Sequence, residues 1–163
     1  MGSRGSVIPF FISLKDKQAF PITDNRMTRF MISLEEGVEL VWHAFDDMKG
    51  GEIYVKKIPS MKVTDVALAV DDNTKQEEVG IRPGEKLHEQ MIGIEDALYT
   101  YEYPEHFKIL PSINDWAKDE ARIGDGIRVP EDFTYTSNNN KEWMEISELQ
   151  EWIEKNEAKI GNI

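Results

Sequence analysis

The sequence predicts an α/β protein, and three stretches lead to that prediction. Residues 33–48 carry apolar side chains at steps of four and three, which is the spacing of an amphipathic helix. Residues 52–56 alternate between polar and apolar side chains, as a strand with one buried face does. Residues 79–92 combine the two patterns, with a strand end, a Pro-Gly turn and a helical run that opens at Glu85. Helices and strands therefore alternate along the chain.

The composition is typical of a soluble globular protein. The 163 residues are 40% hydrophobic and 31% charged, which is enough for one domain with its own core. The formal net charge is −12, whereas nucleic-acid binding depends on basic surfaces, so we expect no nucleic-acid partner. The charge is uneven, at +3 in residues 1–34 and −9 in residues 91–163. An anionic ligand would therefore meet the N-terminal part more readily.

Other kinds of site and location are also disfavoured. The chain has no cysteine, so it offers no disulfide, thiolate nucleophile or cysteine-bound metal. His43, His88 and His106 lack metal-ligand spacing, and we predict no metal site. No apolar run is long enough to span a membrane, and the N-terminus lacks the apolar segment of a signal peptide. We therefore expect a cytoplasmic protein with no membrane partner.

The first third of the chain predicts two helices and two strands. A short helix is expected over 7–17, with Pro9 in its first turn, and strands over 20–23 and 26–32. Ser33 and Glu36 form a capping box that opens the next helix, which Lys49-Gly50-Gly51 ends. We expect the apolar stripe of this helix to be core. Its members are Leu34, Val38, Val41, Phe45 and Met48.

The rest of the chain predicts shorter elements. Strands are expected over 52–56, 61–63, 99–103 and 107–110, and a turn of helix over 94–97. Thr64-Asp65 is typical of a cap for the helix that carries Val66, Ala67 and Val70. We expect a loop over 112–129, a turn-prone polar segment over 133–140, and a last helix that Ser147 and Gln150 open with a capping box.

Arg82 stands at the corner of the predicted strand–turn–helix, where Pro83 biases it toward an extended backbone. Its guanidinium offers a planar pair of donors that matches two oxygens of a phosphate or carboxylate. One interpretation is an anion-binding arginine. The other is a surface arginine paired with a nearby glutamate, a contact that contributes little stability. The spacing alone leaves both interpretations open.

Four ordered blocks of sequence carry a resemblance to a known family. The blocks are Gly2-Ser3-Arg4-Gly5-Ser6-Val7-Ile8-Pro9-Phe10-Phe11, Pro21-Ile22-Thr23-Asp24 with Met27-Thr28-Arg29-Phe30, Gly50-Gly51-Glu52-Ile53-Tyr54-Val55 with Ile58-Pro59-Ser60-Met61, and Ile81-Arg82-Pro83-Gly84-Glu85-Lys86-Leu87-His88-Glu89. In these blocks the chain resembles the inverting UDP-N-acetylglucosamine 4,6-dehydratases among the extended short-chain dehydrogenases. The resemblance covers nearly the whole chain.

The resemblance implies the C-terminal, substrate-binding part of a Rossmann-type fold, without the N-terminal dinucleotide-binding half. Residues 1–163 would be one substrate-binding portion, with residues 1–6 a loop from the missing half and residues 104–163 an irregular acidic extension that ends in a helix. The sequence agrees, because it has no glycine-rich turn between a strand and a helix. Alone, the chain would expose residues 7–11 and 34–48, so we expect poor solubility or oligomers.

The resemblance implies NADP as the cofactor, with most of its site outside this chain. Gly2, Ser3 and Arg4 would line the cofactor side of the cleft. We assign no catalytic residue, because the family's Tyr-x-x-x-Lys pair has no counterpart here: lysines follow Tyr54 two and three residues on, not four.

The resemblance also implies UDP-N-acetylglucosamine as the ligand of the cleft. Val7 would touch this substrate, Thr23 would bond its uridine end, and Arg82 would bind its diphosphate. Ser137 and Asn138 would close over the ligand.

Arg29 has two interpretations. It could reach the site, or it could only pair with Asp24 or Glu36, and the structural role is the one that we favour.

The predicted function is part of an NADP-dependent UDP-N-acetylglucosamine 4,6-dehydratase with 5-epimerisation, which serves the synthesis of surface polysaccharide or flagellin glycans. The complete enzyme would be a homo-oligomer. Two alternatives stay open. One is a non-catalytic remnant or a stand-alone nucleotide-sugar-binding module, and the other is part of a related UDP-sugar 4-epimerase.

Overall fold

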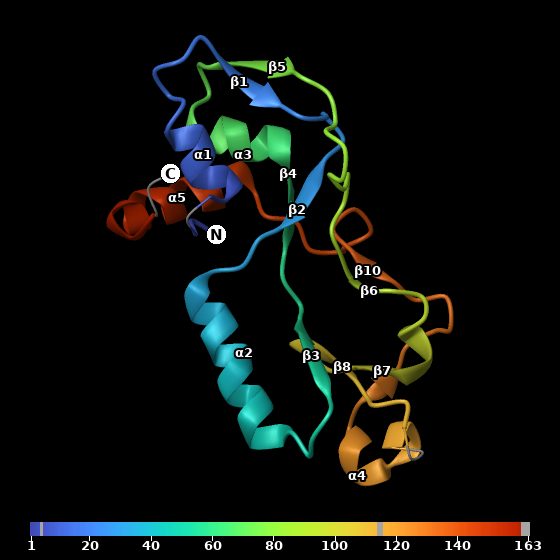
Figure 1. The fold of residues 1–163 in the computed structure, drawn as a ribbon. Helices are drawn as coiled ribbons and strands as arrows, with labels where there is room; N and C mark the ends of the chain where they lie inside the picture. The colour runs from blue at the N-terminus through green and yellow to red at the C-terminus, as the bar shows by residue number, and fades with distance from the viewer. Residues whose placement is uncertain (4, 114–115, 161–163) are drawn as a thin grey trace. The chain divides into compact units, whose positions relative to one another are not determined.

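The computed structural model describes residues 1–3, 5–113 and 116–160 (Figure 1). The chain forms two compact units, each built from segments that lie far apart in the sequence. Unit 1 consists of residues 1–33, 59–89 and 137–163, and unit 2 of residues 34–58 and 90–136. Both units contain helices and strands, which confirms the predicted α/β class.

Unit 1 combines helices with two pairs of short strands. Its helices are α1 (Val7–Ile12), α3 (Val63–Val70) and α5 (Ile146–Asn156), and a 3₁₀ turn, η3, follows at Glu157–Lys159. Its strands are β1 (Ala19–Ile22), which pairs in parallel with β5 (Lys75–Glu78), and β2 (Thr28–Phe30), which pairs antiparallel with β4 (Ser60–Lys62). The predicted positions of β1, β2 and β4 are confirmed to within a few residues.

The core of unit 1 lies where α1 and α5 pack on α3, and where α3 meets β1 (Figure 1). Side chains from all four elements are at most 1% exposed there: Ile8, Phe11, Phe20, Val66 and Leu149. The rings of Phe11 and Phe20 lie 5.1 Å apart and join α1 to β1. Burial of these large apolar side chains is the main force that holds the three sequence segments of unit 1 together.

Unit 2 is built around an antiparallel sheet. Its strands are β3 (Ile53–Lys56), β6 (Gln90–Ile92), β7 (Thr100–Glu102), β8 (His106–Ile109), β9 (Ile127–Arg128) and β10 (Tyr135–Thr136). The sheet has the order β3-β8-β7-β9, and β6 pairs separately with β10. The helices of unit 2 are α2 (Leu34–Asp47) and α4 (Glu120–Ile123), with 3₁₀ turns η1 (Ala97–Tyr99) and η2 (Trp116–Lys118).

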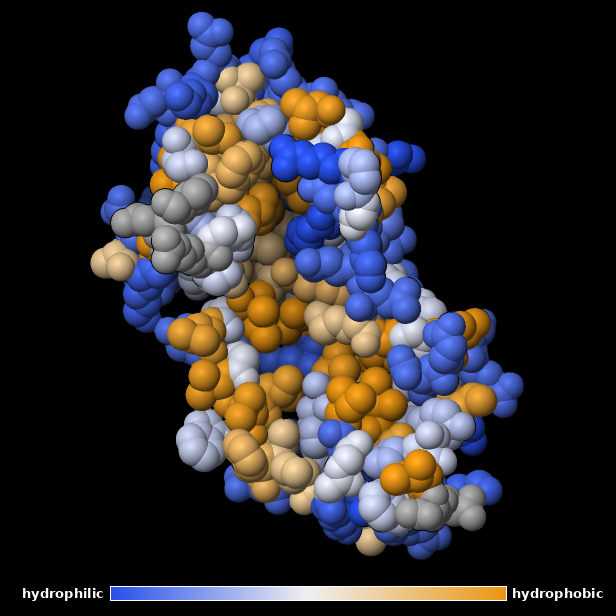
Figure 2. Space-filling view, viewed as in Figure 1, coloured by the Kyte–Doolittle hydropathy of each residue, from blue (hydrophilic) through white to orange (hydrophobic). Residues whose placement is uncertain are grey.

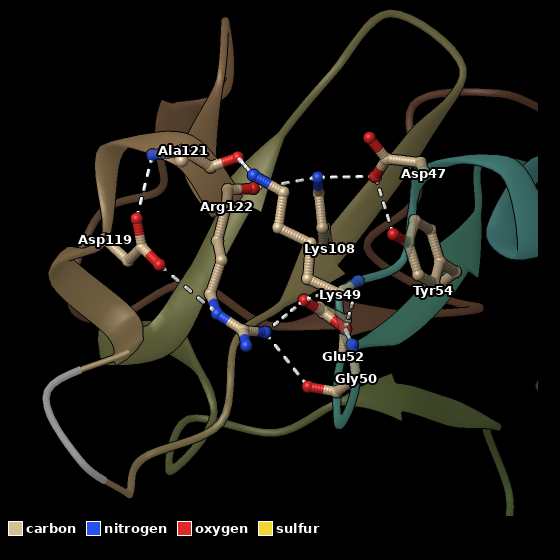
Figure 3. A network of polar contacts seen from close by, with 9 residues as sticks. All are labelled: Asp47, Lys49, Gly50, Glu52, Tyr54, Lys108, Asp119, Ala121 and Arg122. Carbon is tan, nitrogen blue, oxygen red and sulfur yellow. Dashed lines mark hydrogen bonds and ion pairs between the residues drawn. The ribbon is translucent and has the colours of Figure 1, made fainter.

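A network of charged side chains ties the sheet of unit 2 to α2 and α4 (Figure 3). Lys108, on β8, is 4% exposed, and its Nζ lies 2.6 Å from Oδ2 of Asp47 and donates to the main-chain oxygen of Arg122 at 2.9 Å. Arg122 in turn pairs with Glu52 and donates to the oxygen of Gly50 at 2.9 Å. Each buried charge therefore has an opposite charge and a hydrogen bond, the condition under which such burial is tolerated.

The apolar stripe of α2 is not core, and that prediction is wrong for the described residues. No residue of α2 is buried, and Leu34 is 76% exposed and Phe45 65% exposed. Figure 2 shows the apolar side chains gathered along this helix. The bounds of the helix are nevertheless as predicted, because they follow from the local spacing of apolar residues. Whether another surface covers the apolar stripe depends on residues far away in the sequence, which local spacing does not indicate.

The helix predicted to open at Glu85 is absent. The Pro83-Gly84 turn is present and β5 precedes it, but an irregular segment with a bend at residues 87–88 and then strand β6 follow. The backbone of residues 87–89 is instead hydrogen-bonded to other segments: Thr28 N donates to Leu87 O at 3.1 Å and Ser137 N donates to Glu89 O at 2.8 Å. In a helix, the carbonyl oxygens of Leu87 and Glu89 would instead accept hydrogen bonds from N–H groups four residues later in the same helix.

Four smaller expectations also need correction. Helix α1 ends at Ile12, short of residue 17, and turns follow it. Helix α3 begins before Thr64-Asp65, so these residues lie inside it rather than capping it. Helix α5 is opened by a capping box of Glu145 and Glu148, two residues before the box predicted at Ser147. The stretch 112–129, predicted as loop, contains η2, α4 and β9.

Candidate functional site

A cleft of about 420 Å³ opens on unit 1. It is lined by residues from α1, the 19–29 segment, the start of α3 and the 79–85 loop: Gly5, Ser6, Val7, Phe10, Phe11, Pro21, Thr23, Met27, Arg29, Val63, Val79, Arg82 and Glu85. Val7, Phe10 and Phe11 reach it together because residues three and four apart share one face of a helix. Three of the predicted substrate contacts, Val7, Thr23 and Arg82, therefore meet at one cleft.

The turn after Thr23 is fixed by a carboxylate. Asp24 is 7% exposed, and its Oδ1 accepts from Arg26 N at 2.8 Å and from Arg26 Nε at 3.0 Å. Its Oδ2 lies 2.7 Å from Arg26 Nη2. The hydrogen bonds from the side chain and then the backbone of Arg26 lower the pKa of Asp24 to about 2. The carboxylate is therefore charged at neutral pH and holds Thr23 at the edge of the cleft.

Arg82 sits on an exposed turn with its side chain at the cleft. Its N–H donates to Oε2 of Glu85 at 3.0 Å, and Glu85 N donates back to Arg82 O at 3.1 Å. Gly84 lies inside this turn with φ +85°, a conformation that glycine adopts without strain. Among the described residues, none pairs with the Arg82 guanidinium. Its charge is available to an anion.

Arg29 lines the same cleft but is engaged within the protein. Its Nη1 donates to Thr28 O at 2.7 Å, Nη2 lies 2.9 Å from Met27 Sδ, and Nε lies 3.8 Å from Oε1 of Glu89. Glu89 is a partner that the sequence did not suggest. Arg29 thus joins β2 to the 87–89 segment and also forms part of the cleft wall. The acidic partner of Arg29 in the structure is Glu89, and its contact with a ligand stays a prediction.

A second cavity of about 320 Å³ adjoins the cleft, and Ser6, Val7 and Arg29 line both. Ser3, one of the predicted cofactor contacts, lies in this second cavity. Glu89 lines it too, and its Oε2 accepts from Phe30 N at 2.7 Å. The Ser6 hydroxyl is buried without a hydrogen-bond partner among the described residues.

The other two predicted cofactor contacts differ in how they are placed. Gly2 is buried with φ +71°, and a Cβ added there would lie 2.8 Å from Cη2 of Trp152. Helix α5 therefore packs directly on the N-terminal loop. Arg4 lies outside the described residues. Contact of Gly2, Ser3 and Arg4 with a cofactor stays a prediction.

Ser137 is placed away from the lining of the cleft. It is fully buried, its Oγ lies 2.7 Å from Thr28 Oγ1, and it accepts from Glu89 N at 2.9 Å. His88 Nδ1 joins the same network, 2.8 Å from Thr28 Oγ1. Asn138, the next residue, is exposed. Their closing over a ligand stays a prediction, while the position of Ser137 gives it a clear structural role.

Phe10 and Glu85 are cleft residues that sequence reasoning missed. Phe10 stands in a quoted block and three positions after Val7, so helical spacing was a signal that it shares the face of Val7. Glu85 was treated as the first residue of a helix that does not form. Its position at the cleft follows from the turn that it closes with Arg82, which a helical pattern does not indicate.

Unit 2 has a cavity of similar size, about 420 Å³, lined by His43, Asp47, Tyr103 and His106 among others. None of the predicted site residues lines it. Within the described ranges, no group of three or more histidine or acidic side chains is arranged to hold a metal ion. Nor is any described helix long and apolar enough to cross a membrane.

The cleft of unit 1 offers groups that can bind a ligand. They are the Arg82 guanidinium, which has no partner among the described residues, the hydroxyl groups of Ser6 and Thr23, and an apolar wall. A free arginine beside hydroxyl groups matches phosphate oxygens, and an apolar wall matches a ring.

Comparisons with known proteins show which family the chain resembles. The family model of the polysaccharide biosynthesis proteins matches residues 1–111. A UDP-N-acetylglucosamine 4,6-dehydratase (inverting) from Campylobacter jejuni subsp. jejuni serotype O:2 is 48% identical over 97% of this chain and 49% of its own length. A UDP-glucose 4-epimerase from Rickettsia rickettsii is 35% identical over 94% of this chain and 46% of its own length.

A solved structure is similar as well. The X-ray structure of Pen from Bacillus thuringiensis superposes with a TM-score of 0.75 at 32% sequence identity, over 95% of this chain and 46% of that one. The chain spans about half the length of the curated relatives it matches. The matched family model and the extent of these identities show that the chain belongs to the polysaccharide biosynthesis protein family.

Proposed function

We propose that this chain is the C-terminal, substrate-binding part of an inverting UDP-N-acetylglucosamine 4,6-dehydratase, and that the cleft of unit 1 binds the UDP moiety. One observation carries the proposal. Val7, Thr23 and Arg82 come from three separate blocks of sequence, and all three line one cleft. The 48% identity to a Campylobacter jejuni enzyme of that name supports the choice of substrate.

In the proposed reaction this chain positions the sugar. Arg82 would bind the diphosphate through two hydrogen bonds, Thr23 would bond the uridine end, and Val7 would contact the substrate. Binding energy from the nucleotide then holds the hexose in place for reaction, which is how remote contacts raise the rate of a chemical step. A nicotinamide cofactor, when bound, would supply the reversible hydride transfer that such a dehydration of the sugar requires, while Val7, Thr23 and Arg82 would hold the nucleotide in place.

The residues present fit only the edge of an NADP site. Ser3 lines the second cavity and the adjacent Ser6 hydroxyl is buried without a partner, as expected beside a ligand. The sequence offers no glycine-rich strand–turn–helix for the pyrophosphate. NADP would therefore be held mainly by the half of the enzyme that this chain does not include. As a separate part of the proposal, the complete enzyme would act as a cytoplasmic homo-oligomer.

A related UDP-sugar 4-epimerase is the second candidate, because a Rickettsia rickettsii protein of that name is 35% identical over 94% of this chain. Both candidates bind UDP, so the assignment of the cleft is common to them. Product analysis separates them. A complete enzyme of the first kind converts UDP-N-acetylglucosamine into a 4-keto sugar, and one of the second kind gives the 4-epimer. A non-catalytic binding module gives neither.

The test of the cleft is calorimetric titration of the 163-residue chain with UDP-N-acetylglucosamine. We expect Arg82→Lys to weaken binding by about 1–3 kcal/mol, the range for charge-assisted hydrogen bonds, because a point charge replaces a two-pronged donor. Arg128→Lys is the matched control, since Arg128 is an exposed arginine of unit 2. Equal affinity in wild type and Arg82→Lys would refute the role of Arg82, and an absence of binding would refute the cleft.

A further inference from the structure

We infer that Phe10 is the residue on which the base of a bound nucleotide stacks. The inference rests on the proposed function and deepens it, by dividing the cleft of unit 1 into a side for the base and a side for the diphosphate. Phe10 was not among the residues that the resemblance implies, and it stands out in α1 by its exposure.

Phe10 differs from its neighbours in α1 by its exposure. Ile8, Pro9 and Phe11 are buried in this short helix, whereas Phe10 is 37% exposed and lines the cleft. A large aromatic side chain that stays open to a cleft beside buried neighbours leaves part of its ring available to another flat group.

The Phe10 ring also contacts other aromatic rings that connect it to the core of unit 1. The Phe10 ring lies 5.6 Å from that of Phe11, which lies 5.1 Å from that of Phe20 in the core. This aromatic series fixes Phe10 before any ligand arrives. A pre-positioned ring gives affinity because little side-chain freedom is lost on binding.

The lining combines the two kinds of chemistry that a nucleoside diphosphate needs, for a flat aromatic base and for an anionic diphosphate. The apolar lining residues are Val7, Phe10, Phe11, Pro21, Met27, Val63 and Val79. The polar lining residues include Ser6, Thr23, Arg29, Arg82 and Glu85. Phe10 offers an exposed aromatic ring to the base, and Arg82 offers a cation to the diphosphate.

The test compares two ligands on the full 163-residue chain, UDP and inorganic pyrophosphate. Stacking of a base on an aromatic ring predicts roughly a tenfold loss of UDP affinity in Phe10→Leu. Pyrophosphate, which has no base, should bind Phe10→Leu as it binds wild type. Arg82→Lys should weaken both ligands. Phe10→Tyr keeps the ring and should keep UDP affinity within about twofold.

Phe45→Leu is the matched control, because Phe45 is an exposed phenylalanine of unit 2 and should leave both affinities unchanged. A second readout needs no variant. Stacking should shift the H5 and H6 proton resonances of the uracil upfield when UDP binds wild type. This readout uses wild type alone, so it tests the stacking even if the Phe10→Leu variant fails to fold.

The outcomes separate this inference from the proposed function. If wild type binds UDP but Phe10→Leu binds it equally well, or the uracil resonances do not move upfield, the stacking role is overturned while the cleft assignment stands. If Phe10→Leu loses UDP and pyrophosphate to the same extent, the ring supports the cleft but does not stack, and the inference fails. If wild type binds neither ligand, the proposed function fails and this inference with it.

Discussion

One buried network of unit 1 joins hydroxyl groups and main chain, whereas the buried network around Lys108 and Arg122 in unit 2 joins opposite charges. In unit 1, the Ser137 hydroxyl bridges Thr28 and the backbone of Glu89. In unit 2, Lys108 pairs with Asp47, and Arg122 with Glu52. Among the described residues, the Arg82 guanidinium of unit 1 stands at an open cleft without a partner, while the buried cations Lys108 and Arg122 of unit 2 are paired with carboxylates. This difference supports our proposal that unit 1 binds the ligand, and it indicates that the charges of unit 2 contribute to stability.

The largest expected effect is the loss of a buried charge pair in unit 2. Arg122→Met leaves the Glu52 carboxylate, whose side chain is 2% exposed, without its cation. Burial alone would raise the pKa of Glu52, but hydrogen bonds from the backbone N–H groups of Glu52, Gly50 and Lys49 and the charge of Arg122 hold that pKa below its usual value. We expect a loss of about 3–5 kcal/mol of unfolding free energy, measured by urea denaturation.

The control for this experiment is the double variant Arg122→Met with Glu52→Gln. Removing both charges should recover much of the lost stability, because no uncompensated charge stays buried. A single variant as stable as wild type would show that the charged network does not hold unit 2 together.

The second effect is on the uncharged network of unit 1. Ser137→Ala leaves the Glu89 N–H without its acceptor, which should cost about 1–3 kcal/mol of stability. Under conditions in which the variant is folded, it should still bind UDP with wild-type affinity. If instead it keeps its stability and loses UDP affinity, Ser137 is a ligand contact, as the resemblance implies, rather than a structural residue.

These two networks also show what the sequence could and could not predict. Helix α2 and the strands β1, β3, β7 and β8 follow from local periodicity and are found where it places them. The pair Lys108–Asp47 joins residues 61 positions apart, and nothing in local spacing indicates it. The same holds for residues 87–89, where long-range hydrogen bonds to Thr28 and Ser137 outweigh a local helical pattern.

The candidate site was predictable only in part, for a related reason. The resemblance supplied Val7, Thr23 and Arg82, and the structure brings them to one cleft. It assigned no role to Phe10, although helical spacing places Phe10 on the face of Val7, because a helix face becomes a site wall only when other segments approach it. It also suggested Ser137 as a ligand contact, although burial beside Thr28 depends on a contact across 109 positions.

The third effect is a pH dependence of unit 2. Burial, aided by the charges of His43 and Lys108, lowers the pKa of His106 to about 4. Between the unfolded value near 6.5 and that folded value, the unfolded chain binds a proton that the folded chain does not, so stability falls as pH falls. We expect a loss of about 1–2 kcal/mol between pH 7 and pH 5, measured by urea denaturation.

His106→Gln removes this titration and should flatten the decline over the same pH range. Asp24 does not contribute there, because its pKa of about 2 keeps it charged. A variant whose stability falls as steeply as that of wild type would place the titrating group elsewhere.

The smallest effect is expected on the exposed stripe of α2. Phe45→Ser should change the unfolding free energy by no more than about 0.5 kcal/mol, because Phe45 is 65% exposed. The same variant should reduce self-association of the chain in sedimentation velocity, since it removes part of an apolar patch. A stability loss above about 2 kcal/mol would mean that the stripe is core after all.

Amide NMR of the ¹⁵N-labelled chain during titration with UDP-N-acetylglucosamine would show whether unit 1 or unit 2 binds the nucleotide. We expect shifts at the cleft of unit 1, above all at Val7, Thr23 and Arg82, and little change in unit 2. Shifts that gather around His43 and His106, beside the cavity of unit 2, would contradict this expectation.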